Sequence, residues 1–369
     1  MVNDYSRTQE KLETRGRRMS FARHFAINSD RCDIDQVTID VLPDNVLLEI
    51  FNFYMQEARP FPYARIEAWH TFVHVCRHWR SIIFASPFRL NLRLLCTDKT
   101  PVREMPNIWP PLPICIQGHN SISDMDSIIA SLEHKDRICQ ISLDEVPDPL
   151  LEKICAALMQ ESFPALKHLL LVSPLGTKFV APPGPFSGGS APLLQEAILE
   201  DVAFPELLNF LSSSANHLAY LSLSNISHSG YISPDAMVTC ISALIGLEKL
   251  HIVTRSSQSH PYRESRRPHL PTRSVQPSLL VFVFRGTSEY LEDFVARIDA
   301  PQLDHLNITF SGKTVFDIPQ LVQFIHRIPS LKALDEARVR FSDLFVYIFI
   351  TNPGPWLRKV LHRNHLRRV

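Results

Sequence analysis

The feature that most constrains this chain is a short apolar pattern that recurs along its length. The pattern is apolar-x-x-apolar-x-apolar, and its first copy is Ile138, Ile141 and Leu143. Successive copies start 24 to 32 residues apart in a chain of 369 residues. Because self-similarity at a fixed period is the signature of stacked structural units, the pattern predicts a repeat architecture. The later copies begin at Leu166, Leu194, Leu218, Leu247, Leu279 and Leu303, with a degraded copy at Leu331.

Apolar residues at helical spacing lie between these copies. Their three- and four-residue steps place them on one helical face. A strand followed by a helix, repeated with short links, predicts parallel strands with right-handed crossovers. The pattern resembles the leucine-rich repeat in an irregular form, and an ordinary globular α/β domain is the alternative. The segments that we expect to be helical lie within residues 150–158, 207–211, 238–245, 291–298 and 321–325.

A second apolar pattern lies nearer the start of the chain, at residues 39–87. Pro43 suits the first position of a helix because proline has no backbone N–H to leave unpaired. A second helix is expected from about Ala64 to Phe84. Two short helices cannot bury this much apolar surface against each other, so they need a partner or another domain. The first helix should end near Pro60, and its apolar face comprises Val46, Leu47, Ile50, Phe51 and Tyr54.

The order of these residues resembles the F-box over residues 39–87. Leu42-Pro43 precedes an aliphatic helix, and Val75-Cys76-Arg77 and Trp79 precede an aliphatic pair. In that family the module docks on the Skp adaptor of cullin-based (SCF) ubiquitin ligases. The alternative is a helical hairpin that only caps the repeats. By position, the resemblance implies adaptor contacts at Leu42, Pro43, Val46, Leu47, Ile50, Val75, Cys76, Trp79 and Ile82.

Composition narrows the partners and the compartment. Lys plus Arg equals Asp plus Glu at 38 each, so no global basic field attracts nucleic acid or a membrane surface. The seven cysteines are scattered with no close pair in the sequence, which indicates buried thiols in a reducing compartment. The first 30 residues lack the apolar core of a signal peptide, and the longest apolar run, Leu344 to Ile350, is far too short for a membrane span. We therefore expect a cytoplasmic or nuclear protein.

These patterns predict an α/β chain in four parts. An N-terminal α-helical F-box-like module at residues 39–95 is followed by an irregular leucine-rich-repeat-like solenoid of parallel strands plus helices at residues 96–350. A flexible tail is expected at residues 1–38 and a basic tail at residues 351–369. Composition predicts loops at residues 180–190 and 254–276. The second loop is basic, so it is either a site for an acidic or phosphorylated partner or a solvated insertion.

Two motifs suggest chemistry, and both are incomplete. Ser311-Gly312-Lys313-Thr314 follows a predicted strand, but Asn307 stands where a phosphate-binding loop needs its first glycine. His70 and His74 have the spacing of a zinc protease helix, with His78 four residues further on, but Thr71 replaces the general base. We therefore expect no enzyme, no metal and no cofactor.

The whole layout resembles F-box proteins with irregular leucine-rich repeats, a type expanded in mushroom-forming fungi. The resemblance implies a substrate receptor in ubiquitin-dependent protein degradation. The module would bind a Skp-family adaptor and through it a cullin, and the repeats would hold an unknown target protein on the strand-lined face or on rim loops. One alternative is a repeat scaffold without a ligase. Another is an NTP-dependent enzyme built on residues 311–314.

Overall fold

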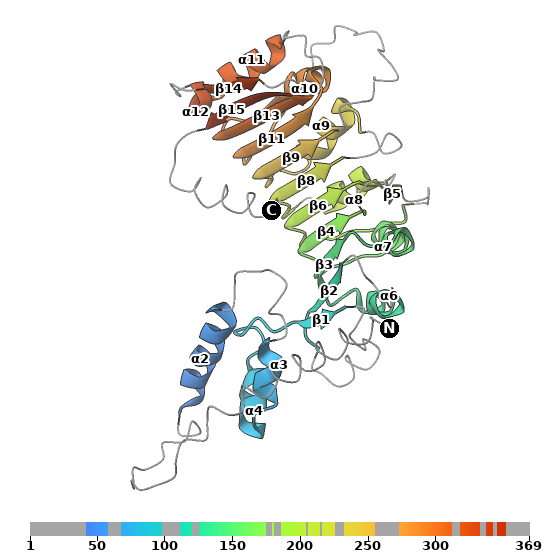
Figure 1. Cartoon of the computed structure of the whole chain (residues 1–369), viewed down its shortest axis with the longest axis vertical. Coiled ribbons are helices and arrows are strands. Elements are labelled where there is room, and N and C mark those ends of the chain that lie inside the picture. Colours follow the sequence, from blue (N-terminus) through green and yellow to red (C-terminus); the bar gives the residue numbers. More distant parts are fainter. Residues whose placement is uncertain are drawn as a thin grey trace, which may run out of the picture. The chain divides into compact units, whose positions relative to one another are not determined.

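The computed structural model describes most of the chain between residues 42 and 351. The chain divides into two units, residues 1–50 and residues 51–369, and the boundary falls within the first described helix. An 11-stranded sheet with helices makes the second unit a mixed α/β structure (Figure 1). The described residues are 42–57, 68–97, 111–119, 125–174, 179–180, 186–203, 206–214, 216–225, 232–254, 273–311, 318–332, 337–341 and 345–351.

The large sheet is built almost entirely in chain order. Its strand order is β1-β2-β3-β4-β6-β8-β9-β11-β13-β15-β14, and every neighbouring pair from β1 to β13 is parallel. The α/β class with a mostly parallel sheet, expected from the sequence, is therefore confirmed. Its strands span Leu94–Cys96 (β1), Ile114–His119 (β2), Ile138–Asp144 (β3), His168–Val172 (β4), Glu196–Glu200 (β6), Tyr220–Ser224 (β8), Lys249–Val253 (β9), Val281–Gly286 (β11), His305–Ser311 (β13), Ala337–Phe341 (β14) and Phe345–Thr351 (β15).

Helices and two small sheets fill the links between these strands. Phe179–Val180 (β5) pairs with Val202–Ala203 (β7), and Ser274–Val275 (β10) pairs with Ile298–Asp299 (β12). The helices span Asp44–Glu57 (α2), Ala68–Val73 (α3), Arg77–Ala85 (α4), Met125–Ser131 (α6), Leu132–His134 (η2, a 3-10 turn), Asp148–Gln160 (α7), Leu207–Ser213 (α8), Pro234–Ser242 (α9), Ser288–Val295 (α10), Pro319–Arg327 (α11) and Pro329–Lys332 (α12).

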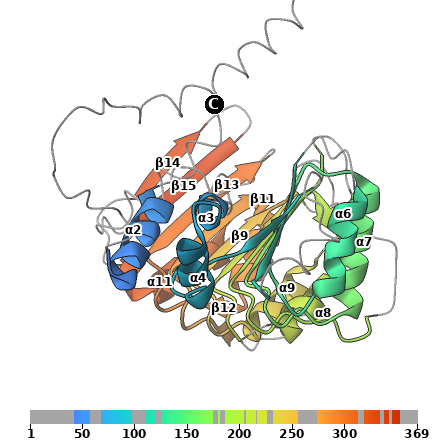
Figure 2. The same cartoon turned by 90° about the horizontal axis from the view of Figure 1, so that it is seen from below.

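The core of the second unit lies between the sheet and its helices. Successive side chains of a strand point to opposite faces, and in β4 Leu169 and Leu171 are buried while their neighbours are half-buried. Strands β6 and β9 show the same alternation. Figure 2 shows helices α6 to α9 along one side of the sheet. One face of the sheet is therefore covered by helices, and the other face is partly open.

The repeat pattern is confirmed at the level of individual strands. Each of the seven regular copies falls on a strand, in the order β3, β4, β6, β8, β9, β11 and β13. In the last six copies the first apolar residue precedes the strand by two positions and is buried in the turn before it. Helices α7, α8 and α11 contain the segments expected at 150–158, 207–211 and 321–325. Helix α9 ends at Ser242, before the last residues of the segment 238–245, and α10 ends at Val295, so Ile298 of the segment 291–298 lies in β12.

The ends of the sheet differ from the prediction. Two parallel strands, β1 and β2, precede the first recognised copy, so the sheet begins at Leu94. The prediction of a degraded repeat copy beginning at Leu331 is wrong, because Leu331 lies in helix α12. The next strands, β14 and β15, are antiparallel to each other, and β15 is antiparallel to β13. Only three residues link β14 to β15, which is too short for a parallel crossover.

Polar contacts join one strand-helix unit to the next. Glu292 of α10 accepts hydrogen bonds from the backbone N–H groups of Gln320 (2.8 Å) and Leu321 (2.9 Å) at the start of α11. The first N–H groups of a helix lack intrahelical acceptors, and Glu292 supplies them. The preceding unit therefore fixes where α11 begins.

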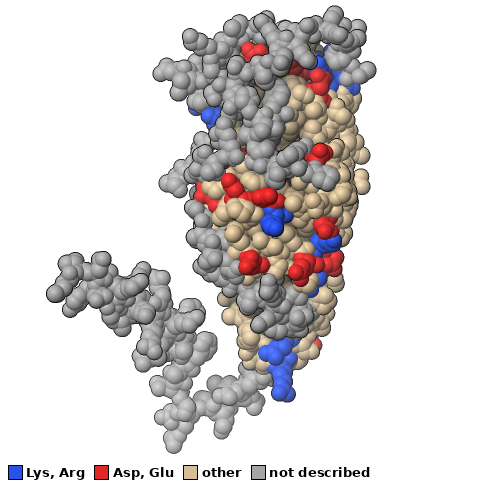
Figure 3. All heavy atoms as spheres, turned by 90° about the vertical axis from the view of Figure 1, so that its right-hand side faces the viewer, with Lys and Arg blue, Asp and Glu red and all other residues tan. Residues whose placement is uncertain are grey.

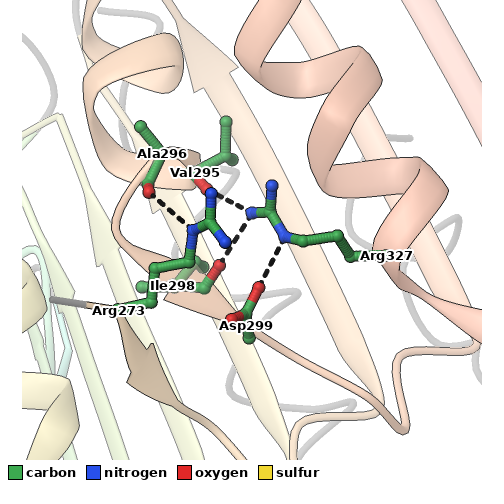
Figure 4. Close-up of polar contacts among 6 residues, drawn as sticks. All are labelled: Arg273, Val295, Ala296, Ile298, Asp299 and Arg327. Atoms are coloured by element: carbon green, nitrogen blue, oxygen red, sulfur yellow. Dashed lines mark hydrogen bonds and ion pairs between the residues drawn. The ribbon is translucent and has the colours of Figure 1, made fainter. Parts of the chain in front are cut away.

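Two arginines hold the link between α10 and β12 (Figure 4). Arg327 Nε donates to Asp299 Oδ1 at 2.6 Å, and its Nη2 donates to the carbonyl oxygens of Val295 and Ile298 at 3.2 Å each. Arg273 Nε donates to the carbonyl oxygen of Ala296 at 3.4 Å.

The loop that the sequence predicted at 254–276 extends too far, since residues 273–276 are structured. Within that stretch Ser274–Val275 forms β10 and Gln276 is buried.

Candidate functional site

Helix α2 begins one residue later than the sequence suggested. Its first described residue is Asp44, and the carbonyl oxygen of Pro43 accepts hydrogen bonds from the N–H groups of Val46 (2.9 Å) and Leu47 (3.1 Å). Pro43 therefore stands just before the helix rather than at its first position. The predicted end near Pro60 agrees with Glu57 as the last helical residue, and residues 58–67 lie outside the described part of the chain.

Helix α2 carries two adjacent apolar stripes. Leu47 and Phe51 are four residues apart and fully buried, each at 0 % exposure. Val46, Ile50 and Phe53, at steps of four and three, form a second stripe that is 38, 43 and 66 % exposed. A surface helix normally buries one stripe and is polar elsewhere, so the second stripe has no ordinary structural use. We call Val46, Ile50 and Phe53 the outward stripe.

The single helix expected from Ala64 to Phe84 is broken. Helix α3 ends at Val73 and helix α4 begins at Arg77, with Cys76 in an extended conformation between them (φ −154°, ψ 170°). The Cys76 Sγ accepts the N–H of Trp79 at 3.4 Å, which caps the start of α4. Arg80 Nε donates to the carbonyl oxygen of Val73 at 2.9 Å, which satisfies the end of α3.

The break corrects two further expectations. His70 lies in α3 and His78 lies in α4, so the three histidines at four-residue steps do not share one continuous helical face. Cys76 was expected to be a buried helical residue, whereas it is half-buried and caps a helix. The zinc-protease spacing therefore has no helical basis in this structure.

Aromatic rings hold the second part of α2 against α3 and α4. The centroid of Phe51 lies 4.8 Å from that of Phe72 and 4.8 Å from that of Trp79. Tyr54 meets Phe72 edge-on at 5.2 Å. Such pairs stabilise beyond the area they bury. Trp79 belongs to this cluster and is only 8 % exposed, and Ile82 is 5 % exposed, so two of the residues that were expected to face an adaptor are buried.

The structure thus sorts the nine predicted adaptor residues by exposure. Leu42 and Cys76 are half-buried. Those that present their side chains to solvent are Pro43, Val46, Ile50 and Val75, the last at 58 % exposure. Those already packed within the chain are Leu47, Trp79 and Ile82.

Two exposed aromatic residues were missed. Phe53 continues the spacing of Val46 and Ile50, so helical periodicity contained the signal for it. Phe88, at 91 % exposure, lies in the turn after α4. A turn has no periodicity, and nothing in the sequence marked this residue.

The partly open face of the sheet is a second candidate surface. Adjacent strands place one residue each in a continuous row across this face. Ser222 Oγ lies 3.4 Å from His251 Nδ1 in the row, and His168 Nδ1 lies 3.3 Å from Glu196 Oε2 beside it. Apolar area interrupted by hydrogen-bonding groups is typical of protein interfaces. The row comprises Leu170, Ile198, Ser222, His251, Val283, Asn307 and Phe349, which we call the sheet row.

Three of the described cysteines are buried in the protonated form. Burial raises the pKa of the Cys96 and Cys155 thiols to about 12 and that of Cys240 to about 11, which keeps them protonated and unreactive. No group of three or more His, Cys, Asp or Glu side chains within the described ranges is placed to hold a metal. In the suspected phosphate loop, Ser311 ends β13, and residues 312–314 lie outside the described part.

The charge distribution and the lengths of the helices give two more observations. Figure 3 shows acidic and basic side chains interspersed on one face, with no broad field of a single sign over its described part. None of the described helices is both long enough and apolar enough to cross a bilayer.

No protein-family model matches this sequence, and a search of curated proteins finds no match.

Proposed function

We propose that this chain is the substrate-recognition subunit of an SCF-type ubiquitin ligase. The outward stripe of α2 docks on a Skp-family adaptor, which in turn binds a cullin, and the sheet row holds a target protein. Catalysis of ubiquitin transfer comes from the partners in this proposal. Holding the target's lysines near a charged ubiquitin carrier raises their effective concentration.

The observation that carries this proposal is the outward stripe itself. Leu47 and Phe51 already bury one side of α2, so Val46, Ile50 and Phe53 are not needed to hold the helix in place. An amphipathic helix that lays such a stripe in an apolar groove is a recurring mode of protein recognition. Burying the stripe stabilises a complex by about 25 cal/mol per Å² of apolar area removed from water.

The buried predicted residues take a different role in this proposal. Trp79 packs on Phe51 and Phe72, and it sits at the start of α4, where Cys76 caps the helix. These residues hold the short turn between α3 and α4, in which Val75 is exposed. We assign them the task of holding the module, and we assign adaptor contact to the outward stripe of α2 and, independently, to Val75.

Co-purification with a Skp-family adaptor tests the docking. Replacing Val46 and Ile50 by Asp puts two carboxylates where apolar contact is required, and each unpaired buried charge costs several kcal/mol. Since about 1.4 kcal/mol is a tenfold change, we expect adaptor recovery to fall by at least ~100-fold. The matched control is Val322→Asp with Ile245→Asp, because these residues are also aliphatic and are 44 and 65 % exposed. The control variant should retain the adaptor.

Undiminished adaptor recovery by the Val46→Asp/Ile50→Asp variant would refute docking through the outward stripe. Failure of the wild-type chain to retain any adaptor would favour a repeat scaffold without a ligase. Leu47→Asp is a poor probe, because Leu47 is fully buried and the change would unfold the module rather than test its surface.

A further inference from the structure

Two cysteines that are far apart in the sequence meet on neighbouring strands. Cys115 of β2 and Cys139 of β3 have their Sγ atoms 3.6 Å apart, and both side chains are buried. The pairing of these strands runs from Ile114 opposite Ile138 to Cys115 opposite Gln140, so Cys139 is an extra residue in a bulge. Bulges redirect a side chain, and this one brings the Cys139 thiol to the Cys115 thiol.

We propose that Cys115 and Cys139 form an oxidisable thiol pair, which a hydroperoxide converts to a disulfide joining β2 to β3. The inference is independent of the proposed ligase role. It adds an oxidation site to the beginning of the sheet.

The two side chains already meet. Cys139 directly precedes Gln140, the residue paired with Cys115, so the cysteines lie on neighbouring strands with their Sγ atoms 3.6 Å apart. The two Sγ atoms must move from 3.6 Å to a bonding distance of about 2 Å, which small side-chain rotations supply. No movement of one strand past the other is needed.

Charge and hydrogen bonding make one thiol of the pair reactive. The Nη1 of Arg93 lies 3.9 Å from Cys115 Sγ and 3.5 Å from Gln140 Oε1, so a fixed cation sits beside the pair. The hydrogen bond with Cys115, together with the charges of Arg93 and His168, lowers the pKa of Cys139 against the opposing effect of burial. The pKa of Cys115 is raised, mainly because its hydrogen bond to Cys139 favours its protonated form.

These properties assign an order to the reaction. The Cys139 thiolate attacks the distal oxygen of the hydroperoxide, whose O–O bond breaks, and the leaving alkoxide or hydroxide takes a proton to give an alcohol or water. Cys139 becomes a sulfenic acid. The Cys115 sulfur then attacks the Cys139 sulfur, the S–O bond breaks, and the hydroxide leaves with the Cys115 proton as water. The peroxide gains the two electrons that the thiol pair loses.

The other buried thiols provide matched controls. Cys155 and Cys240 are buried like the pair, but burial raises their pKa, so each stays a thiol at neutral pH. A disulfide in a reducing compartment is usually transient and redox-sensing, which is the behaviour expected of this pair.

The test treats the folded full-length chain with hydrogen peroxide, quenches it by alkylation under denaturing conditions, and maps the peptides by mass spectrometry. We expect a linked Cys115–Cys139 peptide in the wild type and in Cys155→Ser. We expect a sulfenic acid at Cys139, trapped by a cyclic 1,3-dione, in Cys115→Ser. Before oxidation, Cys139 should alkylate faster than Cys155, because Cys139 is 7 % exposed and lies beside the Arg93 cation, whereas Cys155 is fully buried.

The wild-type result alone decides the proposal, so it does not depend on a variant that folds. Recovery of both Cys115 and Cys139 as free thiols, at a peroxide dose that oxidises the half-buried Cys76, would overturn it. Linkage of either residue to another cysteine would also overturn it. Neither outcome bears on adaptor binding, which is measured separately.

Discussion

The indole N–H of Trp69 donates a hydrogen bond of 3.0 Å to the backbone carbonyl oxygen of Arg93. Trp69 lies in α3, and Arg93 is the residue before β1, so this bond joins the helical segment to the start of the sheet. The indole is 2 % exposed and packs edge-on against Phe84 at 6.0 Å. The orientation of α3 and the path into the sheet are therefore coupled through one side chain.

Replacing Trp69 separates the hydrogen bond from the packing. Trp69→Phe keeps most of the apolar volume but leaves the Arg93 carbonyl oxygen without its donor, and should lower the free energy of unfolding by about 1–2 kcal/mol. Trp69→Ala also creates a cavity and should cost about 3–5 kcal/mol. Urea denaturation measures both changes. Equal losses for the two variants would contradict this division, and the control Phe88→Ala, at a residue 91 % exposed, should change stability by less than about 0.5 kcal/mol.

Cys76 distinguishes a capping role from an adaptor contact. Its Sγ accepts the N–H of Trp79, and serine is a preferred residue for that position. We therefore expect Cys76→Ser to keep the stability of the chain and its recovery of a Skp-family adaptor. Cys76→Val removes the acceptor and should cost about 1 kcal/mol. If Cys76→Ser lost the adaptor while its denaturation curve stayed unchanged, the thiol itself would have to touch the adaptor.

Gly189 occupies a site where no other residue fits. A Cβ atom added there would overlap the carbonyl oxygen of Leu158, near the end of α7. The N–H of Gly189 also donates to the carbonyl oxygen of Met159 at 3.1 Å, so the loop cannot move away freely. Gly189→Ala should lower the free energy of unfolding by more than about 3 kcal/mol. Gly246→Ala is the control, because the nearest atom to its added Cβ is 3.9 Å away, and its thermal midpoint should match that of the wild type.

Two histidines on the sheet should make the chain less stable in acid. Burial lowers the pKa of His251 and of His305 below 6.5. The unfolded chain then takes up protons more readily than the folded chain as the pH falls through about 6.5, and stability falls with it. The double variant His251→Gln/His305→Gln should therefore lose less stability than the wild type between about pH 7 and pH 5. Between about pH 7 and pH 8 both proteins should behave alike, and urea midpoints across this range give the comparison.

Sequence reasoning succeeded where one face of an element is buried. The copies from Ile138 to Leu303 each place alternate residues under the helices, and a period of two is visible in a single sequence. It did not include β1 and β2 in the repeat series, because Leu94, Leu95 and Cys96, like Ile114, Cys115 and Ile116, are all buried. A continuous apolar run has no period to recognise.

At the candidate site, periodicity in the sequence was again informative only in part. Leu47 and Val46 are adjacent and both aliphatic, so periodicity found the helix without showing which stripe the chain itself buries. The break before α4 depends on the Cys76 thiol as a cap, and cysteine is not among the residues that predict helix starts. Cys115 and Cys139 are 24 residues apart, close to the period of the repeats, but their meeting depends on the bulge at Cys139, which no sequence pattern marked.

The strand order at the far end of the sheet makes β15 indispensable. Within the described part of the chain, β14 reaches the sheet only through β15, which lies between β14 and β13. A truncation before Phe345 would release both strands at once and leave the backbone groups of His305–Ser311 unpaired along one side. Such a truncation would replace the five-residue edge strand β14 by the seven-residue strand β13, and a longer unprotected edge pairs more readily with further chains and promotes aggregation.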